Sequence, residues 1–409
     1  MKLYSILFLL LMVGEQPITG KQIETNILKV KTGLDILVSE KFDLINGNNI
    51  GLVTNQSGIN YNSIPNVRLF MELDHVHFKE IFAPEHGFFG NISAGQSIDE
   101  QKPDEFSTIY SLYGNTRKPT PNMLEGLDLI FYDIQDIGTR FYTYISILGL
   151  LMEAAAEAEI PIIILDRPNP LGGEHIERPI LDVTYSSFVG MYPIPIRYGL
   201  TVGELARMFA GEKWIKSIPE LRVVRMQNWE RNMVFDETGL PSIKPSPNIP
   251  DLETAIIYPG MCLLEATNIS EERGTLQSFK KVGSPWYYDE ITKDMNSMKL
   301  TGVKFEIINF TPISILGMSE QPKYLNQKCI GMKTIIHDKS NYNSVETGLK
   351  FLYITQIMSA KSFTVKPENI NKLWLNNHLT QLLQGKSSLK KILKEMDTDE
   401  ALFRKQREP

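Results

Sequence analysis

The chain has 409 residues, of which 42% are hydrophobic and 22% are charged, an ordinary composition for a globular protein. This length suggests two domains, each with enough apolar material for a core. The net charge is -6 and no basic run occurs, which argues against a nucleic-acid partner, because a grip on phosphate backbones needs clustered cations.

The N-terminus predicts a signal peptide over residues 1–24. Lys2 supplies the positive start, and the apolar run from Tyr4 to Val13 is too short to span a membrane comfortably. No cysteine lies nearby to carry a lipid. We therefore expect a mature chain from about residue 25 with no stable membrane insertion after signal removal, and an uncleaved anchor is the alternative.

Apolar runs over residues 50–54, 79–83, 127–132 and 161–165 predict four buried strands in the first part of the chain. Residues 141–159 have helical character between the last two. Thr201 and Glu204 have the spacing of a capping box at the start of a helix over 201–210. Strand and helix in alternation predict an α/β fold with a parallel sheet and right-handed crossovers.

The segment 241–250 is rich in Pro and Ser, cannot be helix and is poor strand, so we place a domain boundary there, with domains over 25–245 and 246–409. In the second domain, strands are expected over 302–310 and 329–337, helices over 345–358 and 380–396, and frayed residues over 403–409. The chain's two cysteines are interpreted as two buried free thiols, Cys262 and Cys329.

Polar clusters follow three of the predicted strands, at Glu85-His86, at Asp133 to Asp136 and at Asp166 to Asn169. Because ligands of open α/β sheets bind beyond the carboxyl ends of the strands, we expect these clusters to converge on one cleft. Glycines after His86 allow a sharp turn there. The alternatives are a Glu85 that caps the next helix and a His86 that is purely structural.

Several kinds of site are disfavoured by their missing motifs. There is no Gly-x-Gly-x-x-Gly, no Walker loop and no Gly-x-Ser-x-Gly, which argues against a nucleotide-dependent enzyme and a serine hydrolase. Only one histidine lies in the strand-end clusters, so we expect no metal and no cofactor. A metal-dependent hydrolase that uses Glu85, His86, Asp133 and Asp166 is kept as an alternative.

Carboxylates beside aromatic residues favour glycoside chemistry, which needs a proton donor and a group that stabilises or traps the cationic sugar ring. Glu85 is the candidate donor, with a pKa raised by Phe88 and Phe89 if they desolvate it. The candidates for the second charge are Asp133, Asp136 and Glu265.

Two polar segments are candidates for substrate binding. Residues 138–144 combine Arg140 with aromatic rings that would stack on sugars, and the alternative is core packing with Arg140 paired to Asp136. Residues 264–275 form the richest polar stretch of the second part, which is more typical of a binding loop than of packing.

Six segments, in chain order, resemble the exo-β-N-acetylmuramidases of the NamZ type, a family long catalogued as a domain of unknown function. They are Asn-Gln-Ser-Gly at 55–58, Ala-Pro-Glu-His-Gly-Phe at 83–88, Tyr-Ser-Leu-Tyr-Gly at 110–114, and the runs 133–144, 166–170 and 267–275. The similarity extends from about residue 33 to beyond residue 348, which is nearly all of the expected mature chain.

This resemblance implies a secreted, periplasmic bacterial enzyme that removes N-acetylmuramic acid from the non-reducing end of peptidoglycan fragments. It implies a Rossmann-like catalytic domain, a smaller C-terminal α/β domain that completes the cleft, and a catalytic glutamate at Glu85. The lactyl carboxylate of muramic acid asks for a cation such as Arg140 or Arg273. Its N-acetyl group asks for a hydrogen-bond donor such as Asn268 or Asn169. Three mechanisms stay open: attack by this acetamide on the anomeric carbon, participation of a second carboxylate, and inversion.

The full expected site follows from these patterns. Glu85, His86 and Asp133 are the expected catalytic residues. The expected substrate-binding residues are Asn55, Gln135, Asp136, Arg140, Tyr142, Tyr144, Arg167, Asn169, Glu265, Asn268, Glu271 and Arg273. The family loop usually reads Ser-Glu-Gly-Arg-Gly-Thr, and Glu272 here takes the place of its first glycine, so we expect a different local turn. A periplasmic glycan-binding protein without catalysis is the non-enzymatic alternative.

Overall fold

The computed structural model describes residues 29–40, 45–73, 76–93, 95, 108–273 and 275–408. The predicted signal peptide lies outside these residues. Among the described helices, none combines the length and the apolar character needed to cross a membrane.

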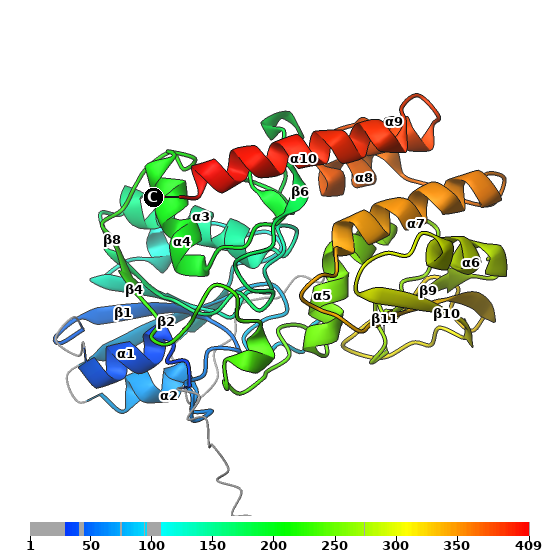
Figure 1. The fold of residues 1–409 in the computed structure, drawn as a ribbon. Helices are drawn as coiled ribbons and strands as arrows, with labels where there is room; N and C mark the ends of the chain where they lie inside the picture. Colours follow the sequence, from blue (N-terminus) through cyan, green and yellow to red (C-terminus); the bar gives the residue numbers. More distant parts are fainter. Residues whose placement is uncertain are drawn as a thin grey trace, which may run out of the picture.

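A parallel sheet forms the centre of the N-terminal part (Figure 1). It has six strands in the order β3-β2-β1-β4-β5-β8. The strand order reverses between the neighbours β1 and β4: β2 and β3 follow β1 on one side of the sheet, and β5 and β8 follow β4 on the other. The strands are β1 (Asn49–Thr54), β2 (His77–Ala83), β3 (Thr108–Ser111), β4 (Leu129–Asp133), β5 (Ile162–Leu165) and β8 (Leu221–Val224).

Helices cover both faces of this sheet, because alternate strand residues point to opposite sides. In β4, Leu129 and Phe131 pack with α1 (Gly33–Glu40) and α2 (Asn66–Met71) on one face. Residues Ile130 and Tyr132 of the same strand pack with α3 (Tyr144–Glu157) and α4 (Val202–Gly211) on the other. Both faces are apolar, which explains why the strands read as continuous hydrophobic runs.

The four predicted strands and the parallel α/β sheet are therefore confirmed. The capping box is also present at the start of α4. The Thr201 hydroxyl accepts a hydrogen bond from the Glu204 amide at 3.2 Å, and the Glu204 carboxylate accepts one from the Thr201 amide at 2.9 Å. The segment 241–250 contains no helix and no extended strand, as expected. The exact domain boundary stays a prediction.

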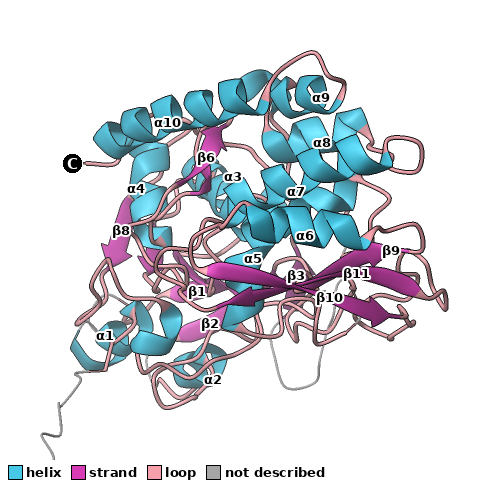
Figure 2. Cartoon of the chain, turned by 45° about the vertical axis from the view of Figure 1, so that its right-hand side comes forward, coloured by secondary structure: helices cyan, strands magenta, loops and turns pink. Residues whose placement is uncertain are grey.

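The C-terminal part is smaller and has an antiparallel sheet with the order β10-β11-β9 (Figure 2). Its strands are β9 (Lys281–Ser284), β10 (Val303–Phe310) and β11 (Cys329–Ile336). In the N-terminal part, β6 (Glu177–Ile180) and β7 (Pro195–Arg197) pair antiparallel in a separate two-stranded sheet. The helices of the C-terminal part are α5 (Leu252–Met261), α6 (Asp289–Ser297), α7 (Ser344–Ser359), α8 (Pro367–Trp374), α9 (His378–Leu383) and α10 (Leu389–Gln406). Cys262 and Cys329 are buried and free, as predicted.

The single helix predicted over 380–396 is wrong, because α9 and α10 are separated by a turn. Gly385 has a φ of +71°, a left-handed conformation that ends α9, and the Ser388 side chain caps α10. Within the described residues 403–408, the predicted fraying is also wrong. Phe403 is fully buried, and the Arg407 guanidinium donates to the Gly173 carbonyl at 2.6 Å, so α10 lies against the N-terminal part (Figure 1).

Two glycines allow α5 and α7 to pack closely. A Cβ added to Gly260 would lie 1.8 Å from the Ser344 carbonyl oxygen, and one added to Gly348 would lie 2.3 Å from the Gly260 oxygen. We expect Gly260→Ala to lower the free energy of unfolding by about 1–3 kcal/mol, because the helices must move apart. In urea denaturation, the matched Gly211→Ala variant at the open end of α4 should be neutral or stabilising, since nothing lies within 4 Å of its new methyl group. Equal destabilisation by both substitutions would contradict this packing role.

Candidate active site

A central cavity of about 530 Å³ lies between the N-terminal and C-terminal parts. The loops after β2 and β3 and the start of α3 line one side, and η5 (Cys262–Ala266) with the following loop lines the other. Five of the predicted site residues line this cavity, namely Glu85, His86, Tyr142, Glu265 and Arg273.

Glu85 lies two residues after the end of β2 and is half-buried. Its Oε2 atom accepts a hydrogen bond from the Thr143 hydroxyl at 2.9 Å, and its Oε1 atom accepts one from the Gly95 amide at 3.2 Å. Burial and then the Glu85 charge raise the pKa of Tyr113 to about 12, which keeps that phenol protonated and able to donate. Glu85 is thus held by donors from three separate segments.

His86 takes a left-handed φ of +72°, which turns the chain sharply after Glu85. Its Nδ1 atom lies 2.8 Å from the Ile92 carbonyl oxygen and donates to it, so the neutral ring leaves Nε2 as an acceptor. Burial lowers the pKa of His86, against the opposing effect of Glu85. The ring is therefore neutral near pH 7.

Phe88 and Phe89 do not enclose Glu85 as expected. Their rings pack edge to face at 5.0 Å, Phe89 is 54% exposed, and neither ring lines the central cavity. The predicted desolvation of Glu85 by these two rings is wrong, because the turn at Gly87 directs them away from the cavity.

A chain of ion pairs forms the opposite wall. The Arg273 guanidinium pairs with Glu265 and lies 3.5 Å from Glu271, and Glu271 also pairs with Lys323 at 2.9 Å. Burial alone would lower the pKa of Arg273, but Glu265 and Glu271 raise it above its usual value. Among the described residues that line the cavity, the carboxylates are Glu85 and Glu265.

The turn at Glu272 explains why glycine suits this position. Glu272 has a φ of +47°, and its side chain is only 5% exposed, with Lys281 at 3.6 Å. Burial raises the pKa of Glu272 to about 7, so the folded protein binds its proton more tightly than the unfolded chain does. The contribution of this carboxyl group to stability therefore falls as pH rises from about 4.5 to about 7.

We expect Glu272→Gly to raise the free energy of unfolding by about 1 kcal/mol at low pH through relief of the left-handed backbone. The gain should grow between about pH 5 and about pH 8, because the variant loses the ionising buried carboxyl. Thermal unfolding at the two pH values measures both effects. The matched control Glu159→Gly changes an exposed residue with a φ of +57° and should give a gain without the pH dependence. A pH-independent gain at Glu272 would contradict the explanation.

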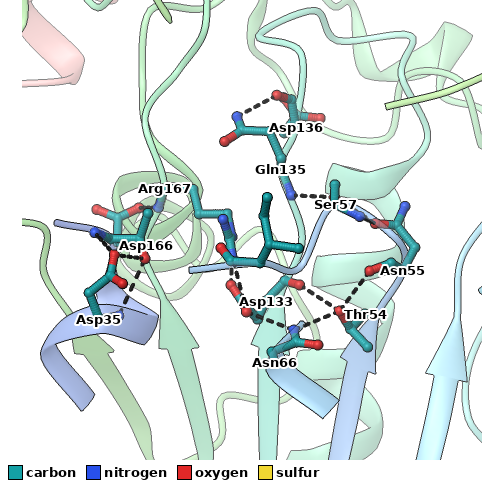
Figure 3. Close-up of polar contacts among 12 residues, drawn as sticks. Asp35, Thr54, Asn55, Ser57, Asn66, Asp133, Gln135, Asp136, Asp166 and Arg167 are labelled. Atoms are coloured by element: carbon teal, nitrogen blue, oxygen red, sulfur yellow. Dashed lines mark hydrogen bonds and ion pairs between the residues drawn. The ribbon is translucent and has the colours of Figure 1, made fainter. Parts of the chain in front are cut away.

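The polar residues at the ends of β4 and β5 form a buried network rather than a wall of the cavity (Figure 3). Asp133 is fully buried and accepts from Arg167 Nε at 2.6 Å, from Arg167 Nη2 at 3.0 Å and from Asn66 Nδ2 at 2.7 Å. Arg167 also donates to the Ile59 carbonyl. The expectation that all three strand-end clusters share one cleft is wrong, because only the Glu85-His86 cluster reaches the central cavity.

This network fills the point where the sheet order reverses, the usual ligand position in such sheets. Only about 10 Å³ remains there, lined by Ser57, Gln135 and Arg167 together with residues of the 235–243 segment. That volume is about enough for one water molecule.

Arg140 occupies the interior and does not line the central cavity. Its side chain is fully buried and donates to the carbonyl oxygens of Pro179 at 2.9 Å, Ile194 at 2.7 Å and Leu373 at 3.0 Å. Burial lowers the pKa of Arg140. Both expectations for this residue, an anion ligand and a partner of Asp136, are wrong, because its two terminal nitrogens donate to backbone carbonyls in the interior.

The remaining predicted residues do not line the central cavity. Asn55 donates to the Tyr144 hydroxyl at 2.9 Å, and Tyr144 packs edge to face on Tyr142. Asp136 accepts from Gly138 and Tyr198, and burial raises its pKa to about 6. Three side-chain amides donate hydrogen bonds to backbone carbonyl oxygens: Gln135 to Pro168, Asn169 to Leu200 and Asn268 to Ser362.

The structure adds cavity residues that the sequence patterns did not indicate. They are Tyr113, Arg117, Thr143, Phe188, Asn248 and Lys372, together with Ser187, Val189, Ser246 and Ile249. Tyr113 and Thr143 lie inside segments of the family resemblance, which was the available signal. Arg117, Phe188 and Lys372 come from three distant segments without any motif. Within the described part of the chain, no three His, Cys, Asp or Glu side chains are grouped to hold a metal ion.

The arrangement suits proton transfer to a bound polar ligand. A half-buried carboxylate faces the central cavity, a second carboxylate also lines it, and rings of Phe141, Tyr142 and Phe188 offer apolar surface. These are the parts that glycoside cleavage needs, with aromatic faces for the sugar rings.

Comparison with known proteins gives the same family over most of the chain. The profile described as exo-beta-N-acetylmuramidase NamZ, N-terminal, matches residues 50–253, and the corresponding C-terminal profile matches residues 256–409. The peptidoglycan beta-N-acetylmuramidase NamZ of Bacillus subtilis (strain 168) is 39% identical over 382 residues, 93% of this chain and 90% of that protein.

Two crystal structures of DUF1343 family proteins from Bacteroides fragilis NCTC 9343 are each 30% identical to the chain. The match to the first has a TM-score of 0.84 and covers 93% of this chain and 97% of that protein's chain. The match to the second has a TM-score of 0.73 and covers 93% of this chain and 98% of that protein's chain. The chain belongs to the exo-β-N-acetylmuramidase NamZ family.

Proposed function

We propose that this protein is an exo-acting glycoside hydrolase that releases N-acetylmuramic acid from the non-reducing end of peptidoglycan fragments. The observation that carries the proposal is Glu85, held by Thr143 and Gly95 at the edge of the central cavity in a chain of the NamZ family. The relative from Bacillus subtilis is named for cleavage of this bond.

In this mechanism, Glu85 donates its proton to the oxygen that leaves with the rest of the glycan. The Thr143 hydroxyl and the Gly95 amide fix the orientation of the carboxyl group, and Tyr113 adds a phenol that stays protonated. These contacts reduce the reorganisation needed before proton transfer.

Glu265 is the proposed second carboxylate, in place of the buried Asp133 and Asp136. Arg273 holds it on the opposite wall of the cavity. From there, its negative charge stabilises the cationic sugar ring that develops as the bond breaks. Water then adds to the anomeric carbon, and the proton that it releases restores the acid at Glu85. His86, neutral and anchored to Ile92, fixes the turn that presents Glu85.

We further propose that residues 1–24 direct export and that the mature protein acts in the periplasm, where peptidoglycan fragments are produced by cell-wall turnover. The short apolar run after Lys2 supports this localisation. Fractionation of cells that express the full chain, with N-terminal sequencing of the product, tests it.

The function is tested with a chromogenic β-linked N-acetylmuramide and the matching N-acetylglucosaminide. The expected result is release of the chromophore from the muramide alone. Calorimetric binding of a muramyl disaccharide without cleavage would overturn catalysis and support a glycan-binding protein. Cleavage of both substrates at equal rates would overturn the proposed specificity.

A further inference from the structure

Among the described residues that line the central cavity, three are cationic, namely Arg117, Arg273 and Lys372. We propose that Arg117 and Lys372 bind the lactyl carboxylate of the terminal muramic acid and so make the enzyme select muramic acid over glucosamine. This inference rests on the proposed function, because it assigns part of the same substrate.

Arg273 already has its charge balanced by the protein. Its guanidinium pairs with Glu265 and lies 3.5 Å from Glu271. A substrate carboxylate at this position would meet two like charges, which disfavours binding there. The family loop therefore serves to hold Glu265.

Arg117 and Lys372 have no carboxylate partner among the described residues that line the cavity, whose acids are Glu85 and Glu265, the latter paired with Arg273. The Arg117 guanidinium stacks over the Phe188 ring, 4.2 Å from its centroid, which orders the side chain without neutralising it. An ordered guanidinium loses less conformational freedom when it binds a carboxylate with two parallel hydrogen bonds.

Lys372 is brought to the cavity by the interior contact of Arg140. Arg140 donates to the carbonyl of Leu373, the residue after Lys372 in α8, and to carbonyls of the N-terminal part. The buried arginine, next to Phe141 of the cavity lining, therefore ties α8 to the N-terminal part. It acts as a positioning residue for the lysine, rather than as the anion ligand itself.

The position of this cationic pair fits the chemistry of muramic acid. Tyr113 connects the two regions, because its phenol interacts with Glu85 and its ring lies 6.1 Å from that of Phe188, on which Arg117 stacks. Muramic acid differs from glucosamine by one lactyl ether on O3, two ring carbons from the bond that is cleaved. A sugar with its anomeric oxygen at Glu85 thus directs the extra carboxylate toward a nearby wall of the cavity.

The test compares the 4-nitrophenyl β-N-acetylmuramide with the same compound as its lactyl methyl ester. The wild type should have a lower KM for the free acid. In the double variant Arg117→Met/Lys372→Met, we expect KM for the acid to rise by about tenfold or more, the loss of a charge-assisted hydrogen bond, with little change for the ester. The matched control Lys390→Met replaces an exposed lysine of α10 outside the cavity and should leave the acid-to-ester ratio unchanged.

The outcomes separate this inference from the function on which it rests. A wild type that cleaves the acid, combined with a double variant that keeps the wild-type acid-to-ester ratio, would overturn the assignment of Arg117 and Lys372 alone. A wild type that cleaves neither compound would overturn the proposed function and the inference together. Equal losses on acid and ester would show a general structural role and also overturn the assignment.

Discussion

Replacement of Glu85 by Gln should lower kcat on a muramyl disaccharide by about 10²–10⁴-fold, the usual contribution of a positioned proton donor. The amide keeps the shape of the side chain: its carbonyl oxygen can accept from the Gly95 amide, and its NH2 group can donate to the Thr143 hydroxyl, which also accepts hydrogen bonds. It cannot supply a proton to the leaving oxygen. Initial rates of muramic acid release, measured over a range of substrate concentrations, give the change in kcat.

The same substitution should leave the stability of the protein almost unchanged. Glu85 is half-buried at the end of β2 and takes part in no ion pair within the described residues, so the thermal midpoint should shift little. A fully folded Glu85→Gln protein with the parental rate would remove Glu85 as the proton donor.

Replacement of Arg167 by Met should lower the free energy of unfolding by about 3–5 kcal/mol, because it leaves a fully buried carboxylate without its cation. Asp133 is 0% exposed and receives two hydrogen bonds from Arg167, at 2.6 and 3.0 Å. Urea denaturation followed by circular dichroism measures the loss.

The matched control is Arg222→Met on β8. Arg222 pairs with Glu220 at 2.6 Å, but both side chains are more than half exposed, so the expected loss is below about 1 kcal/mol. Equal losses for the two variants would contradict the view that Asp133 and Arg167 hold the sheet together. Full stability of Arg167→Met with lost activity would return this pair to the catalytic machinery.

Much of the N-terminal fold was predictable because its strands are buried on both faces. Residues such as Ile130 and Phe131 are adjacent, point to opposite sides and are both fully buried, so the strand reads as an unbroken apolar run. The C-terminal helices were harder. The break between α9 and α10 depends on one glycine in a sequence that otherwise keeps helical composition, and the burial of Phe403 depends on packing against distant segments.

The site was predicted only in part, because polar residues at strand ends serve two purposes. Glu85 reaches the cavity, whereas Asp133 and Arg167 satisfy each other inside the sheet. In the sequence, cavity residues and residues of the buried network look alike, because both follow apolar strands. The prediction of Arg140 as an anion ligand failed for a related reason. An arginine among aromatic residues is compatible with a sugar-binding site and equally with a buried side chain that donates to backbone carbonyls. Arg117 and Lys372 are isolated exposed cations, and only the fold brings them together.

The most direct test of Glu85 as the proton donor compares two leaving groups in the Glu85→Gln variant. The 2,4-dinitrophenolate group of an aryl muramide leaves without protonation, whereas the leaving sugar of a natural disaccharide needs a proton from the enzyme. We predict that the variant loses most of its activity on the muramyl disaccharide but retains near-parental cleavage of the dinitrophenyl compound. An equal loss on both substrates would contradict the assignment.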